Sequence, residues 1–176
     1  MPLWKPLASL PPVASDGTLK AAVLVPLYED GDDLRLVLTR RPDDMRTHAG
    51  DVVFPGGMID PGDEGPVGTA LREAWEEVGI PPDHVEILGG LEPVTTRSAE
   101  MWIAPVVARI RRPSELRPEP GEVAAIIEPT IGQLLDDGAW VTRDWHGRTM
   151  WFHEFPEGIL WGATALMVRR LLEFFR

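Results

Sequence analysis

Three glutamates are spaced so that one helix would bring their carboxylates together. Glu73, Glu76 and Glu77 stand at positions i, i+3 and i+4, with no basic residue interleaved on their face. Like charges at this spacing oppose helix formation by about 0.2–0.5 kcal/mol per pair. A bound hard cation would turn that repulsion into a binding site, because Mg²⁺ and Mn²⁺ take oxygen ligands and complete their shell with water and substrate phosphates. The alternative is an acidic helix face that is merely solvated.

The residues before this cluster favour a metal-assisted attack on phosphate. Gly56 and Gly57 let the backbone pass close to a ligand. Asp60, Asp63 and Glu64 could supply further oxygen ligands from the intervening loop. A basic cluster that could receive an anion lies shortly before the glycines and comprises Arg40, Arg41, Arg46 and His48. An anion binder, a glycine turn and a carboxylate cluster therefore follow one another along the chain.

The helix that must carry the glutamates is predicted over residues 66–78. At about 100° per residue, one side is apolar and the three glutamates lie on the other. Pro66 suits a first helical turn, and Gly79 provides a C-terminal stop. The apolar side is predicted to contain Val67, Leu71, Ala74, Trp75 and Val78.

The remaining pattern indicates a single mixed α/β domain. A hairpin is predicted from two apolar runs, residues 21–28 and 34–39, that flank an acidic turn. Strands on either side of helices suggest an α/β sandwich. Residues 1–18 are rich in proline and are expected to form a loosely held arm, which leaves residues 19–176 as the domain. The other expected elements are strands at 85–88, 102–110 and 148–153, and helices at 131–135 and 162–175.

The composition excludes several classes of protein. With 28 acidic against 17 basic residues the net charge is −11, which argues against a general nucleic-acid binder. The absence of cysteine excludes disulfides and thiolate metal sites. No apolar run approaches the roughly 18 residues of a membrane span, and the N-terminus lacks a signal-peptide stretch, so we expect a soluble, cytoplasmic protein.

The acidic excess is concentrated locally. Residues 57–86 contain eight acidic side chains against one arginine, whereas residues 34–50 contain four arginines against two aspartates. Cations would be held in the first segment, and phosphates could be received by the second. A small polyanionic substrate is therefore compatible with the negative net charge.

The segment from Gly57 to Ile80 resembles the Nudix box, usually written G-x5-E-x7-R-E-U-x-E-E-x-G-U, where U is a bulky aliphatic residue. The R-E-x-x-E-E core is intact. Six residues separate Gly57 from Glu64, so Asp63 holds the position counted from the glycine and Glu64 the position counted from the arginine. Ala74 is smaller than the usual U residue.

A second pattern precedes the box. Residues 38–60 are similar to L-L-T-x-R-S-x3-R-x3-G-x3-F-P-G-G-x2-D, the pattern of the coenzyme A pyrophosphatase branch of the family. Val37 replaces one leucine and Pro42 replaces the serine. Glu122 and residues 161–165 are similar to later segments of the same branch.

The resemblance implies a Nudix fold, an α/β/α sandwich with a mixed β-sheet, and metal-dependent hydrolysis with Mg²⁺ or Mn²⁺. Coenzyme A would give 4′-phosphopantetheine and 3′,5′-ADP. Glu73 and Glu77 would be the principal metal ligands, with Glu76 a third ligand or base partner. Asp63 or Glu64 would add a further ligand. Arg72 would hold the carboxylates in register by ion pairing.

Other residues are candidates for handling water and substrate. Glu122 would orient water from a downstream loop, or is an ordinary surface residue. Arg40 and Arg46 would contact the nucleotide phosphates beside Gly56 and Gly57, or would pair with nearby aspartates. An adenine could stack on Trp102 or Trp161.

Two alternative functions remain open at this stage, and so does the oligomeric state. The protein could be a Nudix pyrophosphatase for ADP-ribose or another nucleoside diphosphate derivative. It could be a noncatalytic Nudix-like ligand-sensing module, although such modules usually lose box glutamates. A homodimer is possible because Nudix proteins often dimerise.

Overall fold

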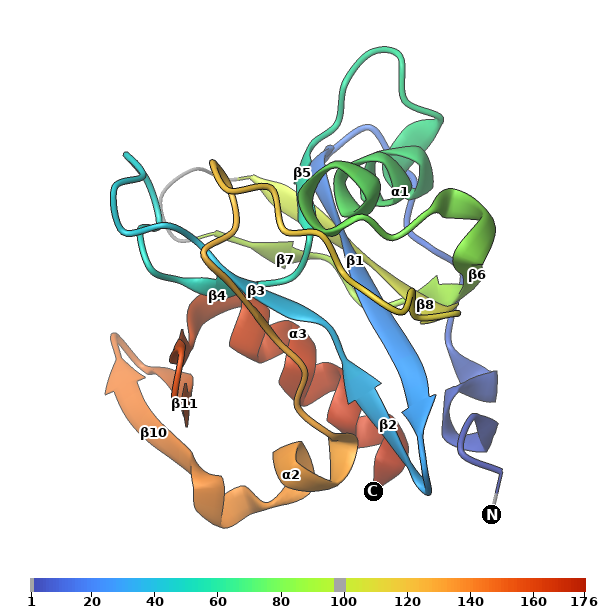
Figure 1. The fold of residues 1–176 in the computed structure, drawn as a ribbon. Helices are drawn as coiled ribbons and strands as arrows, with labels where there is room; N and C mark the ends of the chain where they lie inside the picture. Colours follow the sequence, from blue (N-terminus) through green and yellow to red (C-terminus); the bar gives the residue numbers. More distant parts are fainter. Residues whose placement is uncertain (1, 97–100) are drawn as a thin grey trace.

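The central sheet is mixed and is built around one long strand, β1 (Figure 1). The computed structural model describes residues 2–96 and 101–176. β1 pairs antiparallel with β2 and parallel with β8, and β8 pairs antiparallel with β6. The short strands β5 and β7 add to β1 and β8 respectively. The bounds of these strands are β1 Leu19–Asp30, β2 Asp33–Leu36, β5 Gly56–Met58, β6 Val85–Gly90, β7 Val94–Thr95 and β8 Trp102–Ile110.

Helices cover both faces of this sheet, which confirms the predicted α/β architecture. Side chains alternate along β1, so that Ala22 and Leu24 face α1 (Gly65–Val78), whereas Val25 and Leu27 face α3 (Gly162–Leu172). Each face forms its own apolar cluster, one with the small residues of α1 and one with the larger residues of α3. The site therefore rests on a strand that is packed on both sides.

Two smaller sheets complete the fold (Figure 1). β3, β4 and β9 form one, and the hairpin β10–β11 with β12 forms the other. The predicted strand 34–39 is divided at Val37, because β2 stays in the central sheet and β3 joins the second one. The bounds are β3 Leu38–Arg40, β4 Val52–Val53, β9 Ala125–Ile127, β10 Trp140–Trp145, β11 Arg148–Phe155 and β12 Gly158–Leu160.

The other predicted strands and helices are confirmed, with small differences at their ends. The short helix α2 is Ile131–Leu135, and α3 is followed by a 3₁₀ turn at Glu173–Phe175. Further 3₁₀ turns are Lys5–Ser9, Pro82–His84 and Asp137–Ala139. Within the described part of the chain, no helix is long and apolar enough to cross a membrane.

The buried face of α1 differs from the predicted one. Ala70, Ala74 and Val78 pack on the sheet as expected for small residues, but Glu77 is buried with them and only 7% exposed. Trp75, predicted to lie inside, is 45% exposed and lies beneath the guanidinium of Arg117 at 5.5 Å. The prediction failed because it assigned every glutamate to the solvent side. Gly79 ends the helix with φ 72°, as predicted.

The N-terminal residues are packed rather than loosely held. Leu7 is 3% exposed and belongs to the apolar cluster on the α3 side. The Gly90 N–H donates to the Pro11 carbonyl at 2.8 Å. Trp4 lies against the guanidinium of Arg109 at 4.8 Å. These contacts fix the segment across the end of β6, beside the central sheet.

Truncation of Leu7 should destabilise the whole domain. Leu7→Ala removes a buried aliphatic side chain, and we expect a loss of about 2–4 kcal/mol in the free energy of unfolding. Urea unfolding followed by circular dichroism measures it. Ser9→Ala, at an exposed position of the same turn, should change stability by less than about 0.5 kcal/mol. Equal stability of the two variants would show that the arm is not part of the folded unit.

Candidate active site

Three carboxylates from two segments of the chain converge at one end of α1. Oxygen atoms of Glu73, Glu77 and Glu122 all lie within 4.8 Å of one another. The Glu73 side chain is 14% exposed, Glu77 is buried, and Glu122 is exposed at the surface. A group of this kind presents only oxygen donors, which is the chemistry that Mg²⁺ and Mn²⁺ prefer.

The glycine pair lets the helix carboxylates approach the backbone of β5. A Cβ on Gly57 would lie 2.7 Å from Cδ of Glu73, and a Cβ on Gly56 would lie 2.5 Å from the carbonyl oxygen of Ala22. Neither position has room for a side chain. The glycines are therefore required by the contact between β5, β1 and α1 as well as by any ligand.

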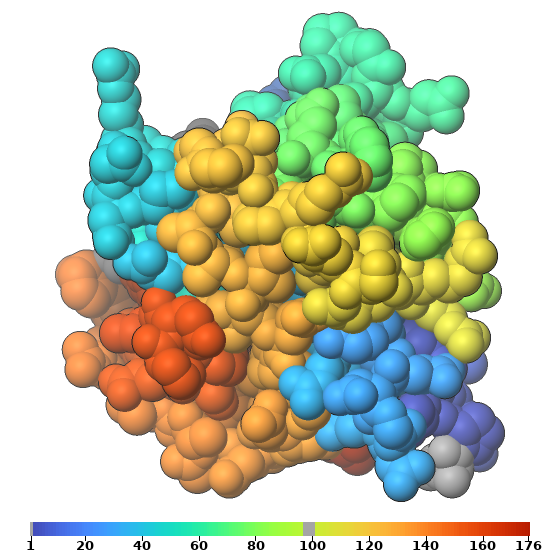
Figure 2. Space-filling view, in the orientation of Figure 1, coloured from blue at the N-terminus to red at the C-terminus, as the bar shows by residue number. Residues whose placement is uncertain are grey.

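Backbone hydrogen bonds fix the segment that carries Glu122. The N–H of Glu119 donates to the Glu77 carbonyl at 2.8 Å, and the N–H of Glu122 donates to the Glu119 carbonyl at 3.0 Å. On the other side, the Ala124 N–H donates to the Arg40 carbonyl at 2.8 Å. Figure 2 shows this gold segment between the cyan loop before β4 and the green helix α1. The third carboxylate is thus tied to both α1 and β3.

Arg72 connects the helix to the loop before it. Its guanidinium binds both oxygens of Asp63, at 2.9 and 3.0 Å, and Oε1 of Glu73 at 2.9 Å. Thr69 also donates to Asp63, at 2.7 Å. Hydrogen bonds from Arg72 above all hold the pKa of Asp63 well below its usual range. This bridge fixes the guanidinium, which in turn orients Glu73.

The remaining acidic candidates lie outside the group of three carboxylates. Asp63 is the partner of Arg72, whereas Glu64 is the exposed N-cap residue of α1 and makes no side-chain capping bond. The Glu76 side chain is 54% exposed and lies 3.3 Å from Arg72. Asp63 and Glu76 are thus both ion-paired with Arg72, Glu76 from the exposed side, whereas Glu64 is exposed to solvent.

Burial and mutual repulsion raise the pKa values of the two inner carboxylates. Burial, followed by the negative charges of Glu73 and Glu122, raises the pKa of Glu77 to about 8, against the opposing effects of Arg41 and a hydrogen bond from the Gly56 backbone. Burial also raises the pKa of Glu73. A strongly shifted carboxylate beside a cleft is a marker of a functional site. A divalent cation would oppose both shifts, because it favours the ionised form of each carboxylate.

A second arginine that acts on this group is Arg41, which the sequence analysis placed in the basic cluster but did not select as a substrate-binding residue. Among the described residues its buried Nε has no hydrogen-bond partner, and its charge acts on Glu77. Arg40 instead forms an ion pair with Asp43, and Arg46 is exposed. The sequence could have distinguished Arg41 from Arg40. Neighbouring residues of a strand point to opposite faces, and Arg41 is the arginine that matches the T-x-R part of the pattern in residues 38–60.

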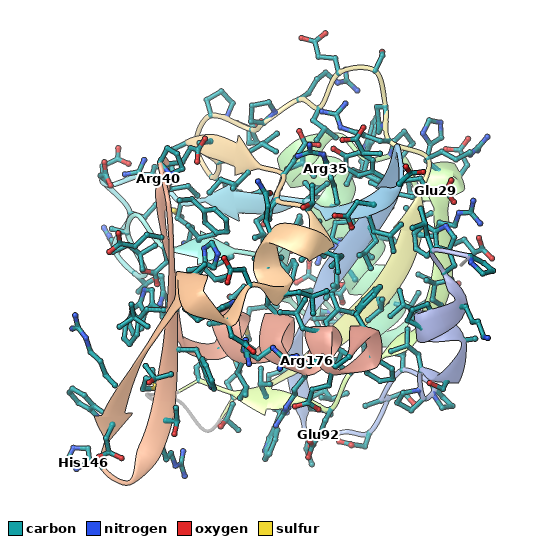
Figure 3. All side chains as sticks on the ribbon, turned by 90° about the horizontal axis from the view of Figure 1, so that it is seen from below. Glu29, Arg35, Arg40, Glu92, His146 and Arg176 are labelled. Atoms are coloured by element: carbon teal, nitrogen blue, oxygen red, sulfur yellow. The ribbon has the colours of Figure 1, made fainter. Side chains whose placement is uncertain are left out.

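A cleft of about 1190 Å³ opens beside the glycine pair. Gly56, Gly57 and Arg41 line one part of it. The start of α3, strands β4, β7 and β8, the loop before β4 and the β10–β11 hairpin are among the other elements that line it. Figure 3 shows His146, another lining residue, at the tip of that hairpin. Trp102 and Trp161 both lie in its wall.

Fold and carboxylate group together define a hydrolase of the Nudix class. Residues 18–146 match the NUDIX domain model, and the chain belongs to the Nudix hydrolase family. It is 36% identical over 163 residues to an uncharacterized Nudix hydrolase NudL of Photorhabdus laumondii, covering 90% of this chain and 86% of that one. The NudL protein of Escherichia coli K12 is 37% identical over 156 residues, which are 86% and 80% of the two chains.

Solved structures share the fold at low sequence identity. A Nudix hydrolase from M. smegmatis, RenU, superposes with a TM-score of 0.62 at 19% identity, covering 93% of this chain and 92% of that one. The NUDIX domain of Shewanella oneidensis NrtR, crystallised with ADP ribose, gives a TM-score of 0.58 at 17% identity over 92% and 90% of the chains. These likenesses confirm the predicted Nudix fold.

Replacing Glu77 should change how stability depends on pH when no divalent cation is present. The folded pKa is about 8, above the value of about 4.3 for an unfolded chain. Between these values the folded state retains a proton that the unfolded state has lost, so stability falls as pH rises. Glu77→Gln should therefore become more stable relative to the parent as the pH is raised through this window.

Urea unfolding in the presence of a chelator, repeated across that pH window, measures the difference. Glu76→Gln on the exposed face of the same helix is the control and should follow the parent at every pH. If the free energies of unfolding of the parent and of Glu77→Gln changed in parallel with pH, the raised pKa of Glu77 would be contradicted.

A methyl group at position 57 should displace Glu73. Gly57→Ala places a carbon 2.7 Å from Cδ of Glu73, and we expect Mn²⁺ binding to weaken about 10- to 100-fold, as for other residues that orient metal ligands. Titration calorimetry measures the affinity. Gly62→Ala is the matched control, because its Cβ would meet no atom within 4 Å. If Gly57→Ala bound Mn²⁺ as tightly as the parent, Glu73 would not be a ligand of the cation.

Proposed function

We propose that the protein is a metal-dependent hydrolase of the diphosphate in coenzyme A or its derivatives, releasing 4′-phosphopantetheine, or its acyl form, and 3′,5′-ADP. The observation that carries this proposal is the group formed by Glu73, Glu77 and Glu122, in which Glu73 lies against Gly57, a residue of the cleft lining. Burial and like charge raise the pKa values of Glu73 and Glu77, and a bound divalent cation would favour the ionised form of both carboxylates.

Glu73, Glu77 and Glu122 would hold Mg²⁺ or Mn²⁺. When bound, such an ion neutralises the diphosphate and lowers the pKa of a water molecule. Water adds to one phosphorus as the bridging P–O bond breaks, and the bridging oxygen leaves with the other phosphate. Glu122, the most exposed of the three, is the residue best placed to orient that water.

Positive side chains of the chain itself would position the substrate and the carboxylates. Arg72 keeps Glu73 in register through its bridge to Asp63, and Glu76 supports the same guanidinium from the exposed side. Arg41 lines the cleft, where its guanidinium would bind a phosphate oxygen of the substrate. Arg46, exposed on the preceding loop, would reach a more distant phosphate such as the 3′-phosphate.

The choice of coenzyme A rests on the pattern in residues 38–60 rather than on the box itself. ADP-ribose is the second candidate, because the NrtR domain with the same fold was crystallised with it. A noncatalytic sensing role is less compatible with a chain that retains Glu73, Glu76 and Glu77.

A substrate panel tests the proposal directly. Purified protein with Mg²⁺ or Mn²⁺ should hydrolyse coenzyme A with a kcat/KM at least about tenfold above that for ADP-ribose or NADH, with products resolved by chromatography. In Glu77→Gln, kcat should fall by about 10²-fold or more, because a buried charge at the cation is lost. Glu64→Gln, at the exposed N-cap of α1, should retain most of the activity. Turnover of ADP-ribose but not of coenzyme A would favour the second candidate, and full activity of Glu77→Gln would remove the metal-site assignment.

A further inference from the structure

Three polar side chains of the cleft form a connected cluster that the proposed reaction does not use. They are His48 and Asp51, from the loop before β4, and Trp161, the N-cap residue of α3. Nδ1 of His48 lies 3.1 Å from Oδ2 of Asp51, and the indole N–H of Trp161 donates to Oδ1 of the same carboxylate at 3.1 Å. The cluster thus connects the start of α3 to the imidazole through one carboxylate.

The hydrogen-bonding roles in this cluster are determined by its chemistry. An indole N–H can only donate, and an ionised carboxylate can only accept. Nδ1 of His48 therefore carries the hydrogen in its contact with Asp51. Both oxygens of Asp51 receive a donor, and the side chain of Asp51 is only 19% exposed. The carboxylate is consequently fixed, and it holds the imidazole in one orientation.

The second nitrogen of the imidazole is available to a ligand. The side chain of His48 is 57% exposed and lines the cleft. Within the described part of the chain, its Nε2 makes no hydrogen bond. The ring is therefore anchored through one nitrogen and open to the cleft through the other.

The backbone at His48 has a conformation that non-glycine residues seldom adopt. Its φ is 54°, and in residues 2–96 and 101–176 the only other non-glycine residue with a positive φ is His146, which also lines the cleft. The Asp51 N–H donates to the His48 carbonyl at 3.2 Å, and the Arg41 N–H donates to the Asp51 carbonyl at 2.9 Å. These bonds keep the turn next to Arg41. Strained backbone of this kind is concentrated at ligand-binding sites.

The surroundings of His48 favour an anionic ligand. Arg41 and Thr47 line the same cleft and offer a guanidinium and a hydroxyl group as donors. The two acidic residues of the described lining are both engaged, Asp51 as above and Glu92 with Arg170 at 3.3 Å. Phosphate oxygens form strong hydrogen bonds with charged donors such as guanidinium and imidazolium.

We propose that His48 binds a phosphate oxygen of the substrate through Nε2, and that Asp51 and Trp161 are positioning residues that hold its ring for this contact. This inference rests on the proposed function and adds a phosphate-binding residue to it. The phosphate binds the doubly protonated ring, in which Nδ1 donates to Asp51 and Nε2 donates to the phosphate. A contact made equally in the bound substrate and in the transition state changes KM rather than kcat.

Replacing the imidazole tests the contact. Asparagine tolerates a positive φ, but its side chain is too short to replace Nε2. We expect His48→Asn to raise KM for coenzyme A about tenfold, the effect of losing one charge-assisted hydrogen bond, with kcat within about twofold of the parent. Ala49→Ser is the control, because Ala49 is exposed in the same turn but lies outside the cleft lining. An unchanged KM in His48→Asn would overturn the proposal.

A double-mutant cycle tests the positioning role. Trp161→Phe keeps an aromatic ring but removes the N–H that binds Asp51. We expect it to raise KM about threefold in the parent and to have no further effect in His48→Asn, because both changes act through the same imidazole. Additive effects would show that Trp161 acts on the substrate independently, and they would overturn its positioning role.

Two substrates identify the phosphate that His48 binds. Coenzyme A carries a 3′-phosphate and a diphosphate, whereas 3′-dephospho-coenzyme A carries only the diphosphate. A rise in KM for coenzyme A alone in His48→Asn would place the 3′-phosphate at Nε2. Equal rises for both substrates would place the diphosphate there. Either result supports the phosphate contact.

Binding measurements separate this inference from the proposed function. If the parent hydrolyses neither form of coenzyme A, the proposed function fails, and calorimetric titration with ADP and with 3′,5′-ADP decides about His48. Weaker binding of either nucleotide to His48→Asn would support the phosphate contact. Equal affinities of the parent and the variant for both nucleotides would overturn it.

Discussion

The repulsion among three neighbouring carboxylates is the constraint around which this domain is arranged. Burial and the neighbouring negative charges raise the pKa values of Glu73 and Glu77, so ionising both of them is unfavourable without a compensating positive charge. A flexible protein would relieve the repulsion by letting the side chains separate. Here strand β5 with its glycines, helix α1 and the hydrogen-bonded 119–124 segment prevent that separation. The repulsion therefore remains, and it favours the binding of a cation.

Positive charge is supplied to this group in two different ways. Arg72 is fully engaged by Asp63, Glu73 and Glu76, so it acts as a fixed structural brace. Arg41 acts on Glu77 through space and also lines the cleft. One arginine therefore maintains the carboxylates, and the other remains available to a bound anion.

Much of this arrangement could be predicted from sequence, because it depends on local signals. Pro66 and Gly79 mark the helix that carries the glutamates, and nearly continuous apolar runs mark β1 and β8. Strands of two or three residues, such as β4, β5 and β7, are too short to show a period. Their pairing is determined by neighbours that are distant in sequence.

The errors at the site have the same origin. Glu77 was assigned to solvent because its burial depends on contacts with other segments, which its own helix does not reveal. Counting residues could not choose between Asp63 and Glu64, whereas the guanidinium of Arg72 binds Asp63. Glu122 was expected from resemblance, but only the hydrogen bonds of the 119–124 segment explain why it faces the helix.

The proline-rich N-terminal segment has a consequence for the edge of the central sheet. β6 is the last strand in the order β2, β1, β8, β6, so its outer side could pair with another chain. Pro11 accepts one hydrogen bond from Gly90, but neither Pro11 nor Pro12 has an N–H to donate onward. The segment therefore covers the end of β6 without presenting free N–H groups to which another strand could pair. At this end of β6 it protects the domain against aggregation by strand addition.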